Sequence, residues 1–199
     1  MRKIIFSLAG LLAFGSLIAQ PVSDNAIIPV SVSLNSILRL NVTTGGNIEF
    51  NVNTLKQYED GIASTAGTTT TFTVASSVDF NIVLFAEDVT FIGSDLEAGG
   101  NTLDLDNVGY TLTNDGSGAD ANYTFVPALL ADPVALTDAP VTIISSAAGA
   151  GAGDILQNRF GVHWEMGTGK GDMKGSSLLT QSLPADRYST NVFIMLAAQ

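Results

Sequence analysis

The sequence predicts an all-β protein, an antiparallel β-sandwich of the Ig-like or jelly-roll-like kind. Apolar and polar residues alternate in several short stretches, which is the pattern of strands with one face in a core. Clusters rich in Gly, Asn, Asp and Ser separate these stretches, and no long segment has a helical period. An outer-membrane barrel is the competing architecture, but it requires evenly spaced strands and aromatic girdles, and the chain has one Trp.

The first expected strand begins at Ile28, and its apolar residues are Ile28, Val30, Val32 and Leu34. Pro or polar residues lie between them, so one face of this strand would be solvated. The same alternation predicts strands at residues 37–42, 48–52, 68–74, 80–85 and 159–166. A last strand is expected at 188–196, with Tyr188, Val192, Ile194 and Leu196 as its apolar residues.

One short helix is expected among these strands, at residues 54–60, with Thr54 or Asn53 as its cap and Gly61 closing it. The turn clusters lie at residues 43–47, 97–101, 114–122 and 145–154. Within the last of them, residues 146–153 resemble a short silk-like run, for which we expect a flexible surface loop.

The N-terminus has the features of a secretory signal peptide. Arg2 and Lys3 precede an apolar run at residues 4–18, and Ala19 offers a small residue for cleavage. We therefore expect a secreted or cell-surface protein with no membrane span after cleavage. Its expected parts are the signal peptide at 1–19, an N-terminal arm and strand at 20–36, and a sandwich domain at 37–199. The chain has no Cys, so neither a lipoprotein anchor nor a disulfide can form.

The acidic balance argues against nucleic acid as a partner. Loss of Arg2 and Lys3 with the signal peptide would lower the formal net charge of −11 by two, to −13. The remaining basic residues are scattered, whereas a nucleic-acid-binding surface groups them. Calcium is a conceivable ligand, because oxygen-bearing side chains gather in two loops. The weak candidates are Asp104, Asp106, Asp115 and Asp120.

Signals for catalysis are weak, and we expect no enzymatic activity and no cofactor other than calcium. The chain has one His, His163, which alternation places beside Glu165 on the solvent face, opposite a buried Trp164. The Gly-rich run at residues 167–171 lacks the spacing of a phosphate-binding loop. A hydrolase with paired carboxylates remains open, and its candidates are Asp79, Glu87 and Asp88.

Both ends of the chain resemble a known family. Residues 183–196 place a Pro-Ala-x-x-Tyr turn before an alternating strand, and residues 30–50 place an extended strand and a Gly turn before Ile48-Glu49-Phe50. These passages resemble the bacterial pilin-like sandwiches of the spore-coat-U and chaperone–usher subunit families. The resemblance implies a subunit that polymerises by donating a strand to its neighbour.

Strand donation has a physical basis of its own. An extended segment can complete another sheet through backbone hydrogen bonds, with alternate side chains filling pockets, and Ile28 to Leu34 has this spacing. Pairing of the same segment within its own domain is equally open. We therefore expect a structural subunit of an extracellular filament, fimbria or surface matrix, forming a homopolymer. The alternative is a monomeric adhesin, or a carbohydrate- or calcium-binding module that uses the loops at 97–107 and 114–122.

Overall fold

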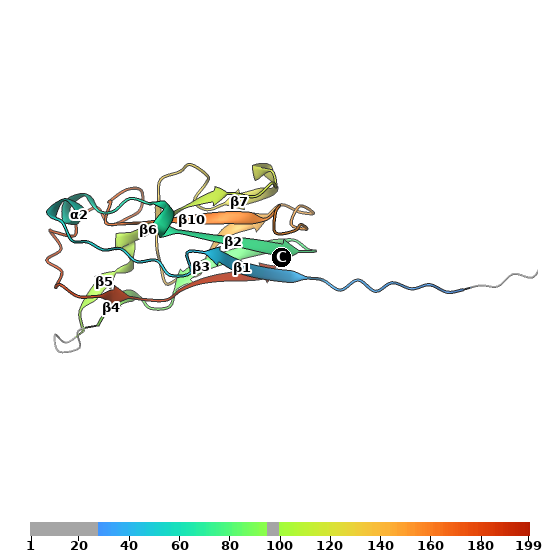
Figure 1. The fold of residues 1–199 in the computed structure, drawn as a ribbon, viewed down its shortest axis with the longest axis horizontal. Helices are drawn as coiled ribbons and strands as arrows, with labels where there is room; N and C mark the ends of the chain where they lie inside the picture. Colours follow the sequence, from blue (N-terminus) through green and yellow to red (C-terminus); the bar gives the residue numbers. More distant parts are fainter. Residues whose placement is uncertain (1–27, 95–99) are drawn as a thin grey trace, which may run out of the picture. The chain divides into compact units, whose positions relative to one another are not determined.

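The structure, a computed structural model, describes residues 28–94 and 100–199, and it is an antiparallel β-sandwich (Figure 1). The predicted fold class is therefore confirmed. The chain divides into two units, residues 1–34 and 35–199, and the strands all belong to the second. The expected signal peptide at 1–19 lies outside the described residues, as does the expected arm up to residue 27.

Two main sheets and one small sheet contain the strands, and all neighbours pair antiparallel. The first sheet has the order β1 (Leu38–Thr44), β2 (Thr69–Ser76), β10 (Arg159–Met166), β6 (Val108–Asn114) and β8 (Val134–Ala135). The second has the order β12 (Val192–Ala198), β3 (Phe80–Ala86), β9 (Val141–Ser146) and β7 (Tyr123–Phe125). The small sheet has the order β11 (Tyr188–Ser189), β4 (Thr90–Gly93) and β5 (Thr102–Asp104).

The expected helix is confirmed as α2 (Leu55–Asp60). Thr54 caps it through a capping box: the Thr54 hydroxyl accepts from the Gln57 N–H at 3.3 Å, and the Gln57 carbonyl Oε1 accepts from the Thr54 N–H at 3.1 Å. Gly61 ends the helix with a φ of 74°. Short 3₁₀ turns occur at η1 (Ala66–Thr68), η2 (Leu105–Asn107) and η3 (Asp120–Asn122).

The core lies between the two main sheets and is rich in aromatic rings. Phe160 of β10 is fully buried, with its ring 5.7 Å from that of Phe72 and 5.1 Å from that of Tyr123. Trp164 is also buried, as predicted. Each such side chain stabilises the fold by about 1.5–3 kcal/mol relative to exposure. This burial allows a chain without disulfides to fold.

The strongest strand predictions agree with the structure. β10 has the predicted bounds, and β1, β2 and β3 each agree to within about two residues. The expected C-terminal strand is divided into β11 and β12, separated by Thr190 and Asn191. The sequence reasoning missed β6 and β9, which are central to the core, and the short strands β4, β5, β7 and β8.

Two predicted strands are wrong. Residues 28–34 and 48–52 have the alternation of strands, yet neither forms one within the chain. Alternation shows which side chains can face a core, but a strand also needs a neighbouring edge for its peptide groups. Glu165 also differs from the prediction, because it is buried, and its carboxylate pairs with the Lys170 ammonium at 3.2 Å.

The loop at residues 146–153 is tied down by one carboxylate. Asp79 accepts from the Gly149 N–H at 2.7 Å and from the Gly151 N–H at 2.8 Å. These bonds favour the charged form, so they hold the pKa of Asp79 below its usual value. The silk-like composition therefore forms a hydrogen-bonded loop, where we expected a flexible one.

Candidate functional site: the groove between β1 and β12

A groove opens between the edges of the two main sheets. β1 is the edge strand of the first sheet and β12 of the second, and the two lie side by side. Beyond Thr44 the two walls separate around a groove of about 710 Å³. One wall consists of residues 45–52, and the other of residues 183–192 and Ile194.

Gly45 directs the chain away from the sheet at the start of the groove. Its φ is 68°, in the left-handed region that favours glycine. A Cβ at this position would lie 2.1 Å from the Thr69 carbonyl oxygen. The Thr70 hydroxyl also donates to the Gly45 carbonyl at 2.7 Å and accepts from the buried Trp164 Nε1–H at 3.0 Å. These contacts fix the point at which the first wall leaves β2.

The first wall has no strand partner. Ile48, Phe50 and Val52 are half-buried and line the groove, whereas Glu49 and Asn51 between them are exposed. Within the described residues, the peptide groups of residues 46–52 form no backbone hydrogen bond. This wall is extended and alternating, and it is available for pairing.

The second wall has the same character. Tyr188, Thr190, Val192 and Ile194 line the groove and are half-buried, while the residues between them are exposed. Ile48 and Phe50 of the first wall and Val192 and Ile194 of the second pack against the core and stay half-buried. The apolar residues at the base of the groove are Phe91, Leu103, Val108, Leu136, Trp164 and Met166. The sandwich is therefore incomplete along this line.

Asp186 positions the second wall. Its carboxylate accepts from the Ser94 N–H at 3.1 Å, from the Ser94 hydroxyl at 2.9 Å and from the Asn101 side-chain amide at 3.0 Å. Gly93 allows this approach, because a Cβ there would lie 2.3 Å from the Asp186 carboxylate. Asp186 therefore holds β11 against β4 at the far end of the groove.

The N-terminal arm, which we define as Ile28 to Leu34, has exposed apolar side chains. Ile28, Val30, Val32 and Leu34 are 79–92% exposed. No strand or helix forms at these residues. The arm therefore has the side-chain pattern of a strand but no sheet, while the groove has an open sheet edge along β12 and an extended, unpaired segment opposite it.

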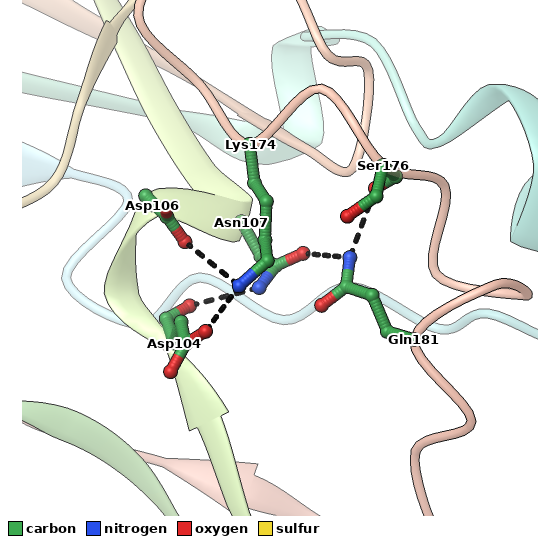
Figure 2. Close-up of polar contacts among 6 residues, drawn as sticks. All are labelled: Asp104, Asp106, Asn107, Lys174, Ser176 and Gln181. Carbon is green, nitrogen blue, oxygen red and sulfur yellow. Dashed lines mark hydrogen bonds and ion pairs between the residues drawn. The ribbon is translucent and has the colours of Figure 1, made fainter.

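Two of the predicted calcium ligands lie around a lysine ammonium (Figure 2). Lys174 forms an ion pair with Asp104, and its Nζ lies 4.0 Å from Asp106 Oδ1. The hydrogen bond to Asp104 raises the pKa of Lys174 above its usual value. Next to this pair, the buried Asn107 Oδ1 accepts from the Gln181 side-chain amide at 2.7 Å. These contacts attach the long loop after β10 to η2.

The other two predicted calcium ligands are in the loop after β6, away from this pair in the sequence. Asp120 accepts from the Asn114 side-chain amide at 2.7 Å. Asp115 follows Asn114, and its backbone N–H donates to the Arg159 carbonyl at 2.9 Å. Within the described ranges, no group of three or more His, Cys, Asp or Glu side chains is placed to hold a metal ion.

His163 lies on the outer face of the first sheet, between two threonines. Its Nδ1 is 3.0 Å from the Thr69 hydroxyl, and its Nε2 is 3.0 Å from the Thr113 hydroxyl. A hydroxyl can donate or accept, so both ring nitrogens are satisfied. These two contacts give His163 a structural place among the polar side chains on the outer face of the sheet.

The carboxylates considered for hydrolysis are also engaged in structural contacts. Asp79 holds the loop described above, Glu87 accepts from the Asn191 side-chain amide, and Asp88 accepts from the Thr190 hydroxyl at 3.0 Å. Glu87 and Asp88 thus fasten the connection after β3 to the connection between β11 and β12.

No family model matches this chain, and no curated protein matches it. The resemblance of its two ends to pilin-like subunits therefore stays a prediction. In the described part of the chain, helices are too short or too polar to cross a membrane.

Proposed function

We propose that the protein is a secreted structural subunit of an extracellular filament or surface matrix. The arm of one copy completes the sandwich of the next copy by occupying the groove between β1 and β12. The observation that carries this proposal is the groove itself, where the edge strand β12 and the unpaired segment 46–52 leave side chains that pack on the core half-buried. The exposed arm supports it as the complementary part.

The dimensions of arm and groove agree. The arm has seven residues, as does the unpaired wall from Gly46 to Val52. Extended strands of this length each span roughly 20 Å, at about 3.3 Å per residue. The arm also carries no charged residue, which suits a groove with an apolar base.

The free energy available from burying the arm is of the same order as the cost of association. Burial of an exposed Val, Leu or Ile side chain contributes about 1.5–3 kcal/mol, so the four arm side chains contribute on the order of 6–12 kcal/mol. Association of two proteins costs about 4–15 kcal/mol in lost freedom. Backbone hydrogen bonds to the open edges add to the burial, and they satisfy peptide groups that are otherwise solvated.

Matched pairs of charged substitutions test the proposal. Val30→Asp with Val32→Asp places two charges on the core-facing side of the arm, whereas Ser31→Asp with Ser33→Asp places the same charges on its outer side. The first variant loses at least about 3 kcal/mol of burial, which is about a hundredfold in affinity. We expect it to stay monomeric in sedimentation velocity, while the second variant assembles as the unmodified chain does.

Equal assembly of the two variants would refute strand donation through this face of the arm. Equal loss of assembly would show that charge repulsion, and not burial, limits association. The chain from Gln20 onward is the material for both variants, since it includes the whole expected arm.

A further inference from the structure

We infer that two copies of the chain pack against each other through the outer face of the second sheet. The inference rests on the proposed function, because it describes how filaments associate side by side into a surface matrix, but the contact uses neither the arm nor the groove. The apolar face, as we call this surface, consists of Val83 and Phe85 of β3 and of Phe193 and Met195 of β12.

β3 and β12 carry apolar side chains on both faces of the sheet. One set, which includes Ile82, Leu84 and Ile194, is buried in the core or packs against it. The side chains between them point to the opposite side, because successive side chains of a strand alternate. Residues 82–86 and 192–198 thus form unbroken apolar runs, which are typical of strands covered on both faces. The composition of both strands therefore predicts a partner on the outer face as well.

The four side chains of the apolar face form one continuous surface. Phe193 lies directly opposite Phe85 in the strand register, and Met195 lies opposite Val83. The two phenyl rings have their centroids 5.2 Å apart. Phe193 is 41% exposed and Met195 is 53% exposed, whereas Val83 and Phe85 are half-buried. A group of large apolar side chains at the surface, in contrast to single scattered ones, marks a contact surface.

The charges of the chain also favour this face for contact between copies. The structure describes all residues of the four strands of the second sheet, and none of them is charged. The first sheet, by contrast, contains Arg39 on β1 and Arg159 and Glu165 on β10. The whole chain has 19 acidic and 8 basic residues, so two copies repel each other over most of their surfaces. The second sheet lets two copies approach without placing charges of one sign together.

A second copy suits this face better than a glycan or a membrane. Sugar-binding surfaces commonly expose Trp and Tyr, whose polar edges stay solvated, whereas the apolar face consists of Phe, Met and Val. Binding at an anionic membrane surface relies on Lys and Arg, and the strands of the second sheet have neither. A second copy supplies a face of equal size and polarity, and the two join as an isologous, two-fold pair.

The size of the face indicates a weak contact for a single pair of copies. Four strands about 4.8 Å apart, with about 3.3 Å per residue along the seven residues of β3 or β12, give roughly 15–20 Å by 20 Å. This area is on the order of 300–400 Å² per copy, against about 800 Å² per partner in a stable complex. Isolated subunits therefore stay apart at micromolar concentration, whereas many such contacts along two filaments add up.

Sedimentation equilibrium tests the inference apart from filament formation. We use the name blocked chain for the chain from Gln20 with Val30→Asp and Val32→Asp, in which we expect donation of the arm to fail. The blocked chain should form dimers reversibly at concentrations on the order of 0.1–1 mM, as a contact of this size implies. Met195→Glu places a charge on the apolar face and should weaken this dimerisation at least about tenfold.

Two further substitutions in the blocked chain complete the test. Ala197 is exposed and follows Met195 on the same side of β12, so Ala197→Glu adds a charge there without removing a large side chain. It should also weaken dimerisation, with the fold retained. Asn41→Glu is the matched control, because Asn41 is exposed on β1, the edge strand of the other sheet. It should change the dissociation constant by less than about threefold.

The contrary outcomes separate the inference from the proposed function. A blocked chain that stays monomeric up to about 1 mM would overturn the inference. Equal dissociation constants for Met195→Glu and Asn41→Glu would place the contact outside the apolar face and overturn it as well. Filaments formed by the blocked chain would instead refute strand donation, and with it the proposed function.

Electron microscopy provides the second measurement, on the chain from Gln20 with its arm unchanged. We expect its filaments to lie side by side, and the filaments of the Met195→Glu variant to be separate and equally long. Filaments of this variant that still lie side by side would contradict the lateral role of the apolar face. Loss of filaments in this variant would show that Met195 acts in the groove contact, and it would contradict the inference too.

Discussion

Replacement of Gly45 by alanine should destabilise the protein at the point where the groove begins. Gly45 has a φ of 68°, and a non-glycine residue in this region costs about 1–2 kcal/mol. The added Cβ would also lie 2.1 Å from the Thr69 carbonyl oxygen, so β2 or the wall must shift. We expect a total loss of about 2–4 kcal/mol in the free energy of unfolding.

Gly46 provides the control for this substitution. It adjoins Gly45 in the sequence, but a Cβ at Gly46 meets no atom within 4 Å. Gly46→Ala should therefore change the free energy of unfolding by no more than about 0.5–1 kcal/mol. In calorimetry, Gly45→Ala should lower Tm by about 5–15 °C, given about 2–4 °C per kcal/mol for a chain of this size. If the two variants melt within about 2 °C of each other, the account of Gly45 as the residue that places the first wall is wrong.

Three further predictions concern the body of the sandwich. Loop N–H groups hold the pKa of Asp79 in the folded protein below its usual 3.8. The charged Asp79 side chain therefore stabilises the folded state above pH 3.8, and this stabilisation is lost as the pH falls through the lowered pKa of the folded state. Asp79→Asn should lower the urea midpoint at pH 7 but not in strong acid, and an equal effect at both would contradict this. Burial raises the pKa of Tyr110 to about 12, so stability should fall as the pH rises from about 10 to 12, and Tyr110→Phe should reduce that fall in urea titrations. Thr70→Val leaves the buried Trp164 Nε1–H without its acceptor and should cost about 1–3 kcal/mol, whereas Thr70→Ser should cost less; equal midpoints would exclude this role of the hydroxyl.

The alternation of apolar and polar residues predicts much of this fold, because the core consists of every second side chain of the main strands. β10 carries buried Phe160, Val162 and Trp164 at every second position, and its predicted bounds are correct. β6 has the same alternation at Val108, Tyr110 and Leu112, yet it lies between Asn- and Asp-rich stretches typical of turns. The central strand β6 was therefore not predicted, because the residues on both sides of it have the composition of turns.

The groove could not be predicted from the sequence, because it depends on which strands lack a neighbour. Alternation predicts one face turned to the core both at residues 48–52 and in the arm. At residues 48–52 the apolar side chains are indeed more buried than the polar ones between them, whereas the apolar side chains of the arm are exposed. Gly45 is visible in the sequence as a turn residue, but its contact with Thr69 depends on the pairing of β1 and β2. Burial of Glu165 likewise depends on Lys170, which follows in the loop after β10.

Electron microscopy of the chain without residues 1–19 tests the central claim most directly. The chain from Gln20 onward contains the arm that is proposed to fill the groove, whereas a chain that begins at Ser36 lacks residues 20–35 and with them the arm. We predict filaments from the first and separate monomers from the second. Monomers from both, or filaments from both, would contradict assembly by donation of the arm.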